Sequence, residues 1–449
     1  MHDVIVVGAG PAGLQVAYQL REQGVSTLVL ESGDEVGGRT RSVQLPGGAA
    51  NTGALFVYRG TPTEDLVREL GIAVTPFRPR TYGIHLDGRT VVEQDDEQLV
   101  AALPLIPAER AELLACLRGA VEEYRAHTAG GEMTDQADAL VGQTVEERFR
   151  TLSPRVRLVL ETAVQGGSVG STAQLSAKYA LRYFASYVAR EQDNRLLAVD
   201  GMQGICRRMA EALADGTVWL STRVEGVEHD PATGTYRVRT SSRTGIGQLR
   251  ARHVVLAVPA PVVPSLLPDL PSWKRAALRT AATPGSTTMV VAVDVRGLPR
   301  FKQWAFVTTV GRPFDCIINP APGEQGFRDD PDVVHLVCYG NSAGHRPDLV
   351  ADRTAIDGWV EEFLAVAPEL RGRIRGVHVQ TWEHCFAVLS PERAAVLEQL
   401  QQPVGRVHFA GDYTSVTAGS HGAFGEGLRV AGAIAADLGR DLRTPVLTG

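Results

Sequence analysis

Lysine, cysteine and long apolar runs are scarce in this 449-residue sequence. Only three of its 45 basic residues are lysines, and 51 acidic residues give it a formal net charge of -6. Because nucleic-acid phosphates require clustered excess positive charge, we expect no nucleic-acid partner. No segment approaches the roughly 18 uncharged apolar residues that a membrane helix needs, so we expect no membrane partner either.

The five cysteines are scattered along the chain and odd in number. Their spacing matches neither a metal site nor a disulfide framework, so we expect no bound metal and a reducing compartment. The first predicted strand begins near residue 4, which leaves no room for a cleavable signal peptide. Together these features favour a cytoplasmic protein.

Residues 4–20 read VIVVGAGPAGLQVAYQL, an apolar run that passes through glycines into a helical pattern. A buried strand, a tight turn at Gly8 and a helix beginning beyond it are typical of a nucleotide-binding unit. Gly10 allows the backbone to approach a pyrophosphate, and Gly13 allows the helix to pack closely. The free N–H groups at the helix N-terminus then favour the anionic pyrophosphate.

A carboxylate follows at the expected distance along the chain. Residues 27–30 predict a second strand, and Glu31 stands at its end, 18 residues after Gly13. A carboxylate at this place accepts hydrogen bonds from a ribose diol. We therefore predict a dinucleotide site near the N-terminus.

The chain is too long for one compact core, and its length predicts two or three domains. We expect one sheet to combine strands near residues 4, 27, 218, 254 and 407. Residues from about 95 to 215 are mainly helical in pattern. The sequence also predicts a short hairpin at 82–92, and a second sheet with strands at 287–295, 304–310 and 333–339.

Four further stretches complete a set in fixed order: GGRT at 37–40, NTGA at 51–54, VVLAVP at 254–259 and FAGD at 409–412. With the first nucleotide-binding stretch, this set resembles the flavin-containing amine oxidase family, which includes monoamine and polyamine oxidases. The resemblance covers nearly the full chain. It implies a resident FAD and an α/β fold in which a Rossmann-type FAD-binding domain carries an inserted α+β substrate-binding domain.

The resemblance also implies where the two domains and the cofactor contacts lie. We expect the FAD-binding domain to combine residues from about 1–75, 200–265 and 376–449, and the substrate-binding domain to combine about 76–199 and 266–375. Arg39 is expected to bind phosphate or to stack near adenine. The expected cofactor contacts are Gly8, Gly10, Gly13, Glu31, Gly38, Arg39, Gly53, Ala54, Val224, Gly411, Asp412 and Phe424.

Enzymes of this family oxidise a carbon–nitrogen bond, and their bound FAD carries the electron chemistry. We expect a small-molecule amine or amide-like substrate to become an imine or iminium, with dioxygen reoxidising the flavin. One alternative is a lankacidin-type amide oxidase that also closes a ring, for which an acid–base residue is needed. Others are a carbon–carbon desaturase and a flavin-binding module without activity. The oligomeric state stays open between a monomer and a homodimer.

The sequence departs from the family pattern in three places. Met289 stands where many members carry a lysine beside the flavin, and Phe424 replaces a tyrosine of the aromatic cage. The other cage wall falls to Trp382 or Phe386. Cys385 lies near the segment where some members attach FAD covalently, but its spacing differs, so we expect non-covalent FAD. The altered cage favours an atypical substrate, such as an intermediate of secondary metabolism or antibiotic biosynthesis.

Three residues are candidates for contact with the substrate. Glu64 begins a predicted helix over the flavin, but it also fits a capping box with Thr61 that would only stabilise that helix. Arg328 and Tyr183 occur in stretches that line the substrate cavity in relatives. A surface arginine and a core tyrosine are the alternative interpretations. We predict that Glu64 is the acid–base group or substrate anchor, with Arg328 and Tyr183 beside the substrate.

Overall fold

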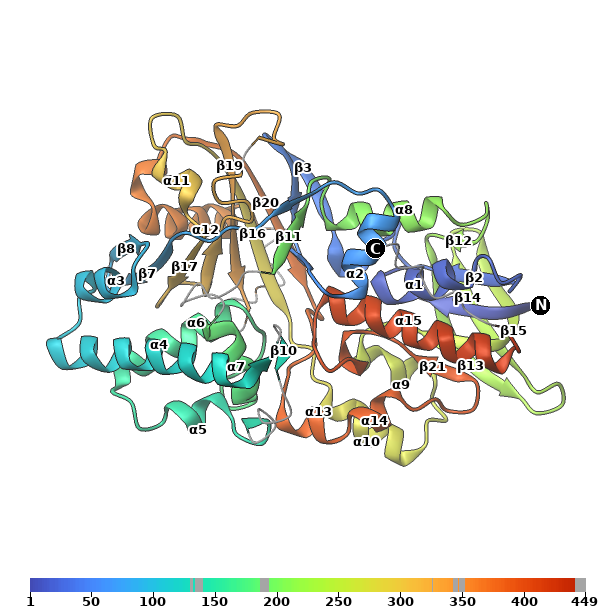
Figure 1. The fold of residues 1–449 in the computed structure, drawn as a ribbon. Helices are drawn as coiled ribbons and strands as arrows, with labels where there is room; N and C mark the ends of the chain where they lie inside the picture. The colour runs from blue at the N-terminus through green and yellow to red at the C-terminus, as the bar shows by residue number, and fades with distance from the viewer. Residues whose placement is uncertain are drawn as a thin grey trace.

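The computed structural model describes residues 1–129, 132–133, 140–185, 194–324, 326–341, 346 and 352–440. Two large sheets organise this chain, and each lies in its own half of the molecule (Figure 1). In the described part of the chain, no helix is both long and apolar enough to cross a bilayer.

The first sheet combines strands from distant parts of the sequence. They are β1 (His2–Val7), β2 (Thr27–Leu30), β12 (Val218–Trp219), β13 (Thr222–Asp230), β14 (Thr235–Ser242), β15 (Gly245–Leu256) and β21 (Val407–Phe409). Their order is β12-β2-β1-β15-β14-β13, with β21 paired to β15. β1 runs parallel to both β2 and β15, and β15 runs parallel to β21. The strands expected near residues 4, 27, 218, 254 and 407 therefore share one sheet, as predicted.

Helices cover both faces of this sheet. On one face lie α1 (Pro11–Leu20), α2 (Pro62–Glu69), α8 (Met202–Glu211) and α15 (Ser420–Asp437). A side chain added at Gly427 of α15 would meet the carbonyl oxygen of Ala12 in α1 at 2.5 Å, so these two helices touch along their backbones. On the other face lie α9 (Val263–Leu266) and α10 (Ser272–Thr280).

The second sheet contains the predicted hairpin and the strands predicted in the second half of the chain. Its members are β7 (Tyr82–Leu86), β8 (Arg89–Glu93), β16 (Ser286–Asp294), β17 (Phe306–Thr309), β18 (Cys316–Ile318), β19 (Val333–Gly340) and β20 (Ile374–Trp382). Their order is β20-β16-β19-β18-β17-β7-β8. Every residue of β16 is buried, because this strand has neighbours on both edges and packed layers on both faces.

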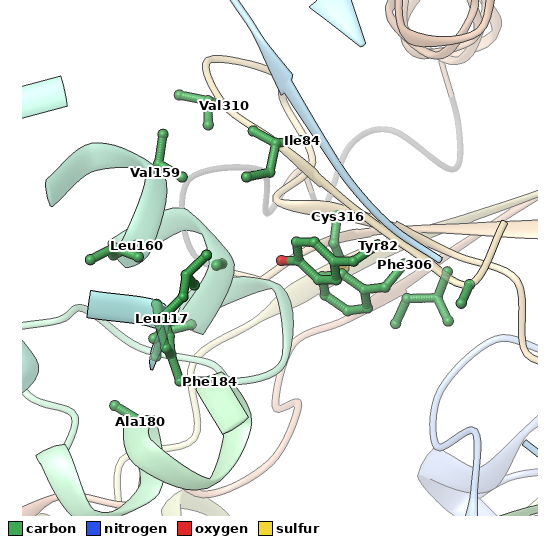
Figure 2. Close-up of a cluster of buried hydrophobic side chains, with 14 of the residues drawn as sticks. Tyr82, Ile84, Leu117, Val159, Leu160, Ala180, Phe184, Phe306, Val310 and Cys316 are labelled. Atoms are coloured by element: carbon green, nitrogen blue, oxygen red, sulfur yellow. The ribbon is translucent and has the colours of Figure 1, made fainter. Parts of the chain in front are cut away.

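The two faces of the second sheet bury different helices. One face packs on α12 (Arg353–Val366), and the other packs on α4 (Pro107–His127), α6 (Pro154–Gly166) and α7 (Ala177–Tyr183). Figure 2 shows the second contact, where the rings of Tyr82 and Phe306 stack with their centroids 5.4 Å apart, opposite Val159 and Leu160 of α6. Most helices of the predicted helical stretch therefore cover one face of the second sheet, whereas α8 covers the first sheet.

The predicted domain boundaries assign two elements to a different domain from the elements on which they pack. β20 pairs with β16, so a boundary at 376 falls inside a strand of the second sheet. α10 packs into the core beside the first sheet, although the substrate-binding domain expected from sequence includes it. Smaller elements connect the halves: β3 (Ser42–Leu45), β4 (Gly48–Asn51), β5 (Val57–Tyr58), β6 (Val74–Pro76), β11 (Arg195–Ala198), α13 (Pro391–Ala395) and α14 (Leu397–Gln401).

Candidate active site

The glycines of the first turn leave space for a ligand at one point only. Gly8 has φ +102°, and a Cβ there would lie 2.6 Å from the carbonyl oxygen of Ala257. A Cβ on Gly13 would lie 2.0 Å from the carbonyl oxygen of Gly8, so α1 packs directly on the turn. A Cβ on Gly10, in contrast, would meet nothing within 4 Å. Gly10 is therefore the place where the helix N-terminus faces open space.

Glu31 is held beside this opening by backbone donors. Its carboxylate accepts hydrogen bonds from the N–H of Ala9 at 2.8 Å and from the N–H of Gly33 at 2.7 Å. A groove of about 620 Å³ runs past Gly10, Glu31 and Val224. A carboxylate has about four lone-pair positions, so Glu31 can still accept from a ribose hydroxyl in the groove.

Arg39 and Asp412 join the two ends of the chain across the site. Arg39 Nη2 lies 2.9 Å from Asp412 Oδ1, and the guanidinium also donates to the carbonyl oxygen of Cys385. The second carboxylate oxygen of Asp412 accepts from the N–H of Ala387 at 2.7 Å. The Arg39 side chain therefore holds the GGRT and FAGD stretches together, a role that the sequence interpretation of a phosphate or adenine contact missed.

Other predicted cofactor contacts surround this ion pair. A Cβ on Gly53 would lie 2.1 Å from the carbonyl oxygen of Arg39, and the N–H of Ala54 donates to the same oxygen at 3.1 Å. Gly38 and Gly411 line the groove. The backbone at 53 and 54 is thus tied to the arginine turn, and only glycine fits at the first of the two positions.

An inner cavity of about 180 Å³ continues from the groove between the two sheets. Groove and cavity share Pro11, Arg39, Trp382 and Ala423 as lining residues. The cavity walls are largely aromatic, and the rings come from both halves of the molecule: Phe56, Tyr58, Tyr183, Tyr339, Trp382, Phe386 and His421. The predicted Tyr183, Trp382 and Phe386 thus meet in one cavity.

Hydrogen bonds fix the rings of the second sheet against the first half of the chain. The hydroxyl of Tyr339 donates to the carbonyl oxygen of Gly53 at 2.7 Å, and the indole N–H of Trp382 donates to that of Thr52 at 3.1 Å. On the opposite side, the rings of Tyr58 and His421 lie 4.5 Å apart between centroids at an angle of 48°. Sequence reasoning missed Tyr58, Tyr339 and His421, because no motif marks them.

Phe424 and Met289, which the sequence predicts beside the flavin, lie in apolar cores instead of at the cavity. Phe424 is 1% exposed and belongs to the apolar core shared by α1, α2 and α15, whereas His421, one helical turn earlier, lines the cavity. Met289 lies in the core between the second sheet and α12, whereas its neighbour Thr288 lines the cavity. Adjacent strand residues face opposite sides of a sheet, so a one-residue error in alignment exchanges them.

Arg328 and Glu64 do not line the inner cavity, and each contacts other parts of the protein. Arg328 donates to the ring of His335 at 2.9 Å and to the carbonyl oxygen of Gly47 at 3.4 Å, and burial lowers its pKa to about 10. Glu64 accepts from the N–H of Gly60 at 2.9 Å. These contacts support a structural role for both residues. The predicted capping box is not formed: Glu64 accepts from Gly60 instead of Thr61, and the Thr61 hydroxyl donates to the carbonyl oxygen of Tyr58 instead of accepting from the helix.

Glu64→Gln is expected to leave turnover and FAD content unchanged, because glutamine also accepts a hydrogen bond from the N–H of Gly60. Glu64→Ala is the control and should lower the free energy of unfolding by about 1 kcal/mol through loss of the helix-start contact. Steady-state rates and urea unfolding of both variants test this. A rate loss of about 100-fold in the glutamine variant at unchanged stability would restore the catalytic interpretation.

The groove fits the adenosine and pyrophosphate of FAD, and the inner cavity continues from it toward the aromatic walls. Open space at the helix N-terminus by Gly10 suits a pyrophosphate, and Glu31 suits a ribose. The fold and these joined cavities are those of a dinucleotide-binding protein whose groove opens into an aromatic inner cavity. The chain belongs to the family of flavin-containing amine oxidoreductases, whose model matches residues 11–435.

Individual oxidases and a desaturase are similar to parts or to all of the chain. Putrescine oxidase from Kocuria rosea is 29% identical over 292 residues, a match that spans 57% of this chain and 56% of that protein's length. Hydroxyneurosporene desaturase from Rhodobacter capsulatus is 40% identical over 74 residues, which are 14% of this chain. The structure of cyclohexylamine oxidase from Brevibacterium oxydans superposes with a TM-score of 0.75 and 25% identity, covering 98% of this chain and all of that one.

Proposed function

We propose that this enzyme oxidises the carbon–nitrogen bond of an amine with one basic nitrogen and an apolar body, using FAD and dioxygen. The observation that carries the proposal is the charge of the cavity lining. Among the described residues, its acidic side chain is Asp412, which is already paired with Arg39 and with the N–H of Ala387. The remaining walls are mainly aromatic and aliphatic.

FAD, held in the groove past Gly10 and Glu31, would supply the acceptor for a hydride equivalent from the carbon beside the nitrogen, with dioxygen as the final electron acceptor. The chain's own residues bind, orient and exclude water. Trp382 and Tyr339 are fixed by their hydrogen bonds to Thr52 and Gly53, so they form rigid walls. Because the cavity offers few charged groups to pair with an ammonium ion, it favours the neutral form of the amine.

We expect this lining to favour amines with one basic nitrogen over amines with two. A diamine would bring its second ammonium group into the cavity, and an unpaired buried charge costs several kcal/mol. We therefore expect kcat/KM for cyclohexylamine or benzylamine to exceed that for putrescine by about 100-fold or more. Peroxide release from each amine, measured with the purified holoenzyme, tests this. N-acetylcyclohexylamine is the control for amide oxidation.

Two results of this assay would contradict the proposal. Preference for putrescine would require a carboxylate that serves the distal ammonium. Faster oxidation of N-acetylcyclohexylamine than of cyclohexylamine would favour the amide-oxidase alternative, including its ring-closing form.

We also propose that FAD is held without a covalent bond. Cys385 lines the cavity, and burial raises its thiol pKa to about 12, which disfavours the nucleophilic thiolate. Acid precipitation should therefore release all flavin into the supernatant as FAD, both from the natural protein and from a Cys385→Ala control. Flavin that stays in the pellet of the natural protein but not of the control would identify a bond to Cys385.

A further inference from the structure

Thr288 is buried at the cavity wall with its hydroxyl uncommitted. Its side chain is 1% exposed and lines the inner cavity, and Oγ1 has no hydrogen-bond partner within the protein. A buried polar atom without a hydrogen-bond partner is destabilising. Such an atom at the wall of a cavity indicates that a bound molecule supplies the partner.

The neighbouring polar groups are already bound elsewhere. Thr288 stands between Tyr339 on β19 and Gln380 on β20. Tyr339 donates to the carbonyl oxygen of Gly53 at 2.7 Å, and the amide of Gln380 donates to that of Thr381 at 2.9 Å. Asn341, another lining residue, donates to Gln165. None of these hydrogen bonds involves the Thr288 hydroxyl.

The strand register explains why the Thr288 side chain lies on the cavity side of the sheet. Along β16, Met289 and Val291 belong to the core that faces α12, while Val290 belongs to the core that faces α6. Thr288 is two residues before Val290, so the two side chains lie on the same face of the sheet, which is the cavity side. Because β16 is the buried strand between β19 and β20, this position is rigid.

We propose that Thr288 Oγ1 accepts a hydrogen bond from the N–H of the amine substrate and so selects the orientation of its nitrogen. The inference rests on the proposed function. A hydroxyl is uncharged, so it can accept from a neutral amine without favouring the ammonium form as a carboxylate does. Accepting from the N–H also leaves the nitrogen lone pair free to assist the loss of hydride from the neighbouring carbon. Thr288 thus acts as a specificity-determining contact in an apolar cavity.

The test compares Thr288→Val, which removes the hydroxyl at nearly constant volume, with Thr288→Ser, which keeps it. Thr283→Val is the matched control, because Thr283 Oγ1 is also buried without a partner but lies outside the groove and the cavity. The probe is 1-methylcyclohexylamine, whose carbon beside the nitrogen carries no hydrogen and so cannot be oxidised. Its dissociation constant is measured from the change in flavin absorbance of the oxidised holoenzyme.

We expect the valine variant at 288 to bind the probe about tenfold more weakly, the serine variant to recover most of the affinity, and the control to bind like the natural protein. FAD retention should be equal in all four proteins. The melting temperature of the ligand-free valine variant at 288 should be unchanged or raised, because an unsatisfied buried hydroxyl is removed.

Three outcomes overturn the inference while the proposed function stands. They are unchanged probe affinity in Thr288→Val with amine oxidation intact, weakened FAD retention in place of weakened probe binding, and failure of Thr288→Ser to recover affinity. If the natural protein neither binds the probe nor oxidises any amine of the panel, the proposed function itself fails, and the inference fails with it.

Discussion

Gly13→Ala is expected to abolish FAD binding and to lower the free energy of unfolding by about 3 kcal/mol. A methyl group at this position would lie 2.0 Å from the carbonyl oxygen of Gly8, a backbone atom that cannot move aside without opening the turn. Moving α1 away from β1 would instead disturb its close contact with α15. Urea unfolding and flavin absorbance of the purified variant measure both effects.

Gly10→Ala is the matched control, because it adds the same methyl group three residues earlier in the same turn. That methyl would meet no protein atom within 4 Å and would project into the groove. We expect normal stability without cofactor and much weaker FAD retention. Equal stability loss in both variants, or full flavin occupancy of the Gly10 variant, would contradict the placement of the pyrophosphate at Gly10.

Asp412→Ala should lower the free energy of unfolding by about 3 kcal/mol and reduce FAD content. The carboxylate is 2% exposed, and its loss removes the acceptor of the Ala387 N–H and one of two acceptors of the Arg39 guanidinium, which keeps the carbonyl oxygen of Cys385. Because the Arg39 side chain is 31% exposed, we expect this loss of free energy of unfolding to lie at the lower end of the range for buried ion pairs. Chemical unfolding of the variant, with and without added FAD, provides the measurement.

An exposed ion pair of the same type serves as the control for Asp412. The side chains of Arg371 and Glu361 lie 2.8 Å apart and are both 61% exposed, so Glu361→Ala should leave stability nearly unchanged and FAD content unchanged. If the two substitutions cost the same, the Arg39 to Asp412 contact does not hold the two ends of the chain together.

The sequence predicts the first sheet well because its signals are local. Short β-branched strands, the glycine turn and Glu31 each depend on residues near one another, and the five expected strands lie in one sheet. The predicted domain boundary near residue 376 falls inside a strand, because the partner of that strand is distant in sequence. β20 pairs with β16, about 90 residues earlier in the chain, and no local sequence pattern indicates such a partner.

The candidate site was harder to predict where both faces of an element are buried. In β16, all nine residues are buried, so no polar alternation marks which side faces the cavity, and Met289 and Thr288 cannot be distinguished. At the start of α15 the sequence likewise does not show whether His421 or Phe424 reaches the cavity. The pairing of Arg39 with Asp412 joins residues 373 positions apart and depends on the complete fold.

Anaerobic mixing of the FAD-loaded enzyme with cyclohexylamine tests the proposed activity most directly. We expect the visible flavin absorbance to be lost, cyclohexanone to form after hydrolysis of the imine, and the admission of air to restore the absorbance with one hydrogen peroxide per ketone. Flavin that stays oxidised with cyclohexylamine and benzylamine, while an amide, a diamine or a carbon–carbon substrate reduces it, would show that the enzyme is not an oxidase of such monoamines.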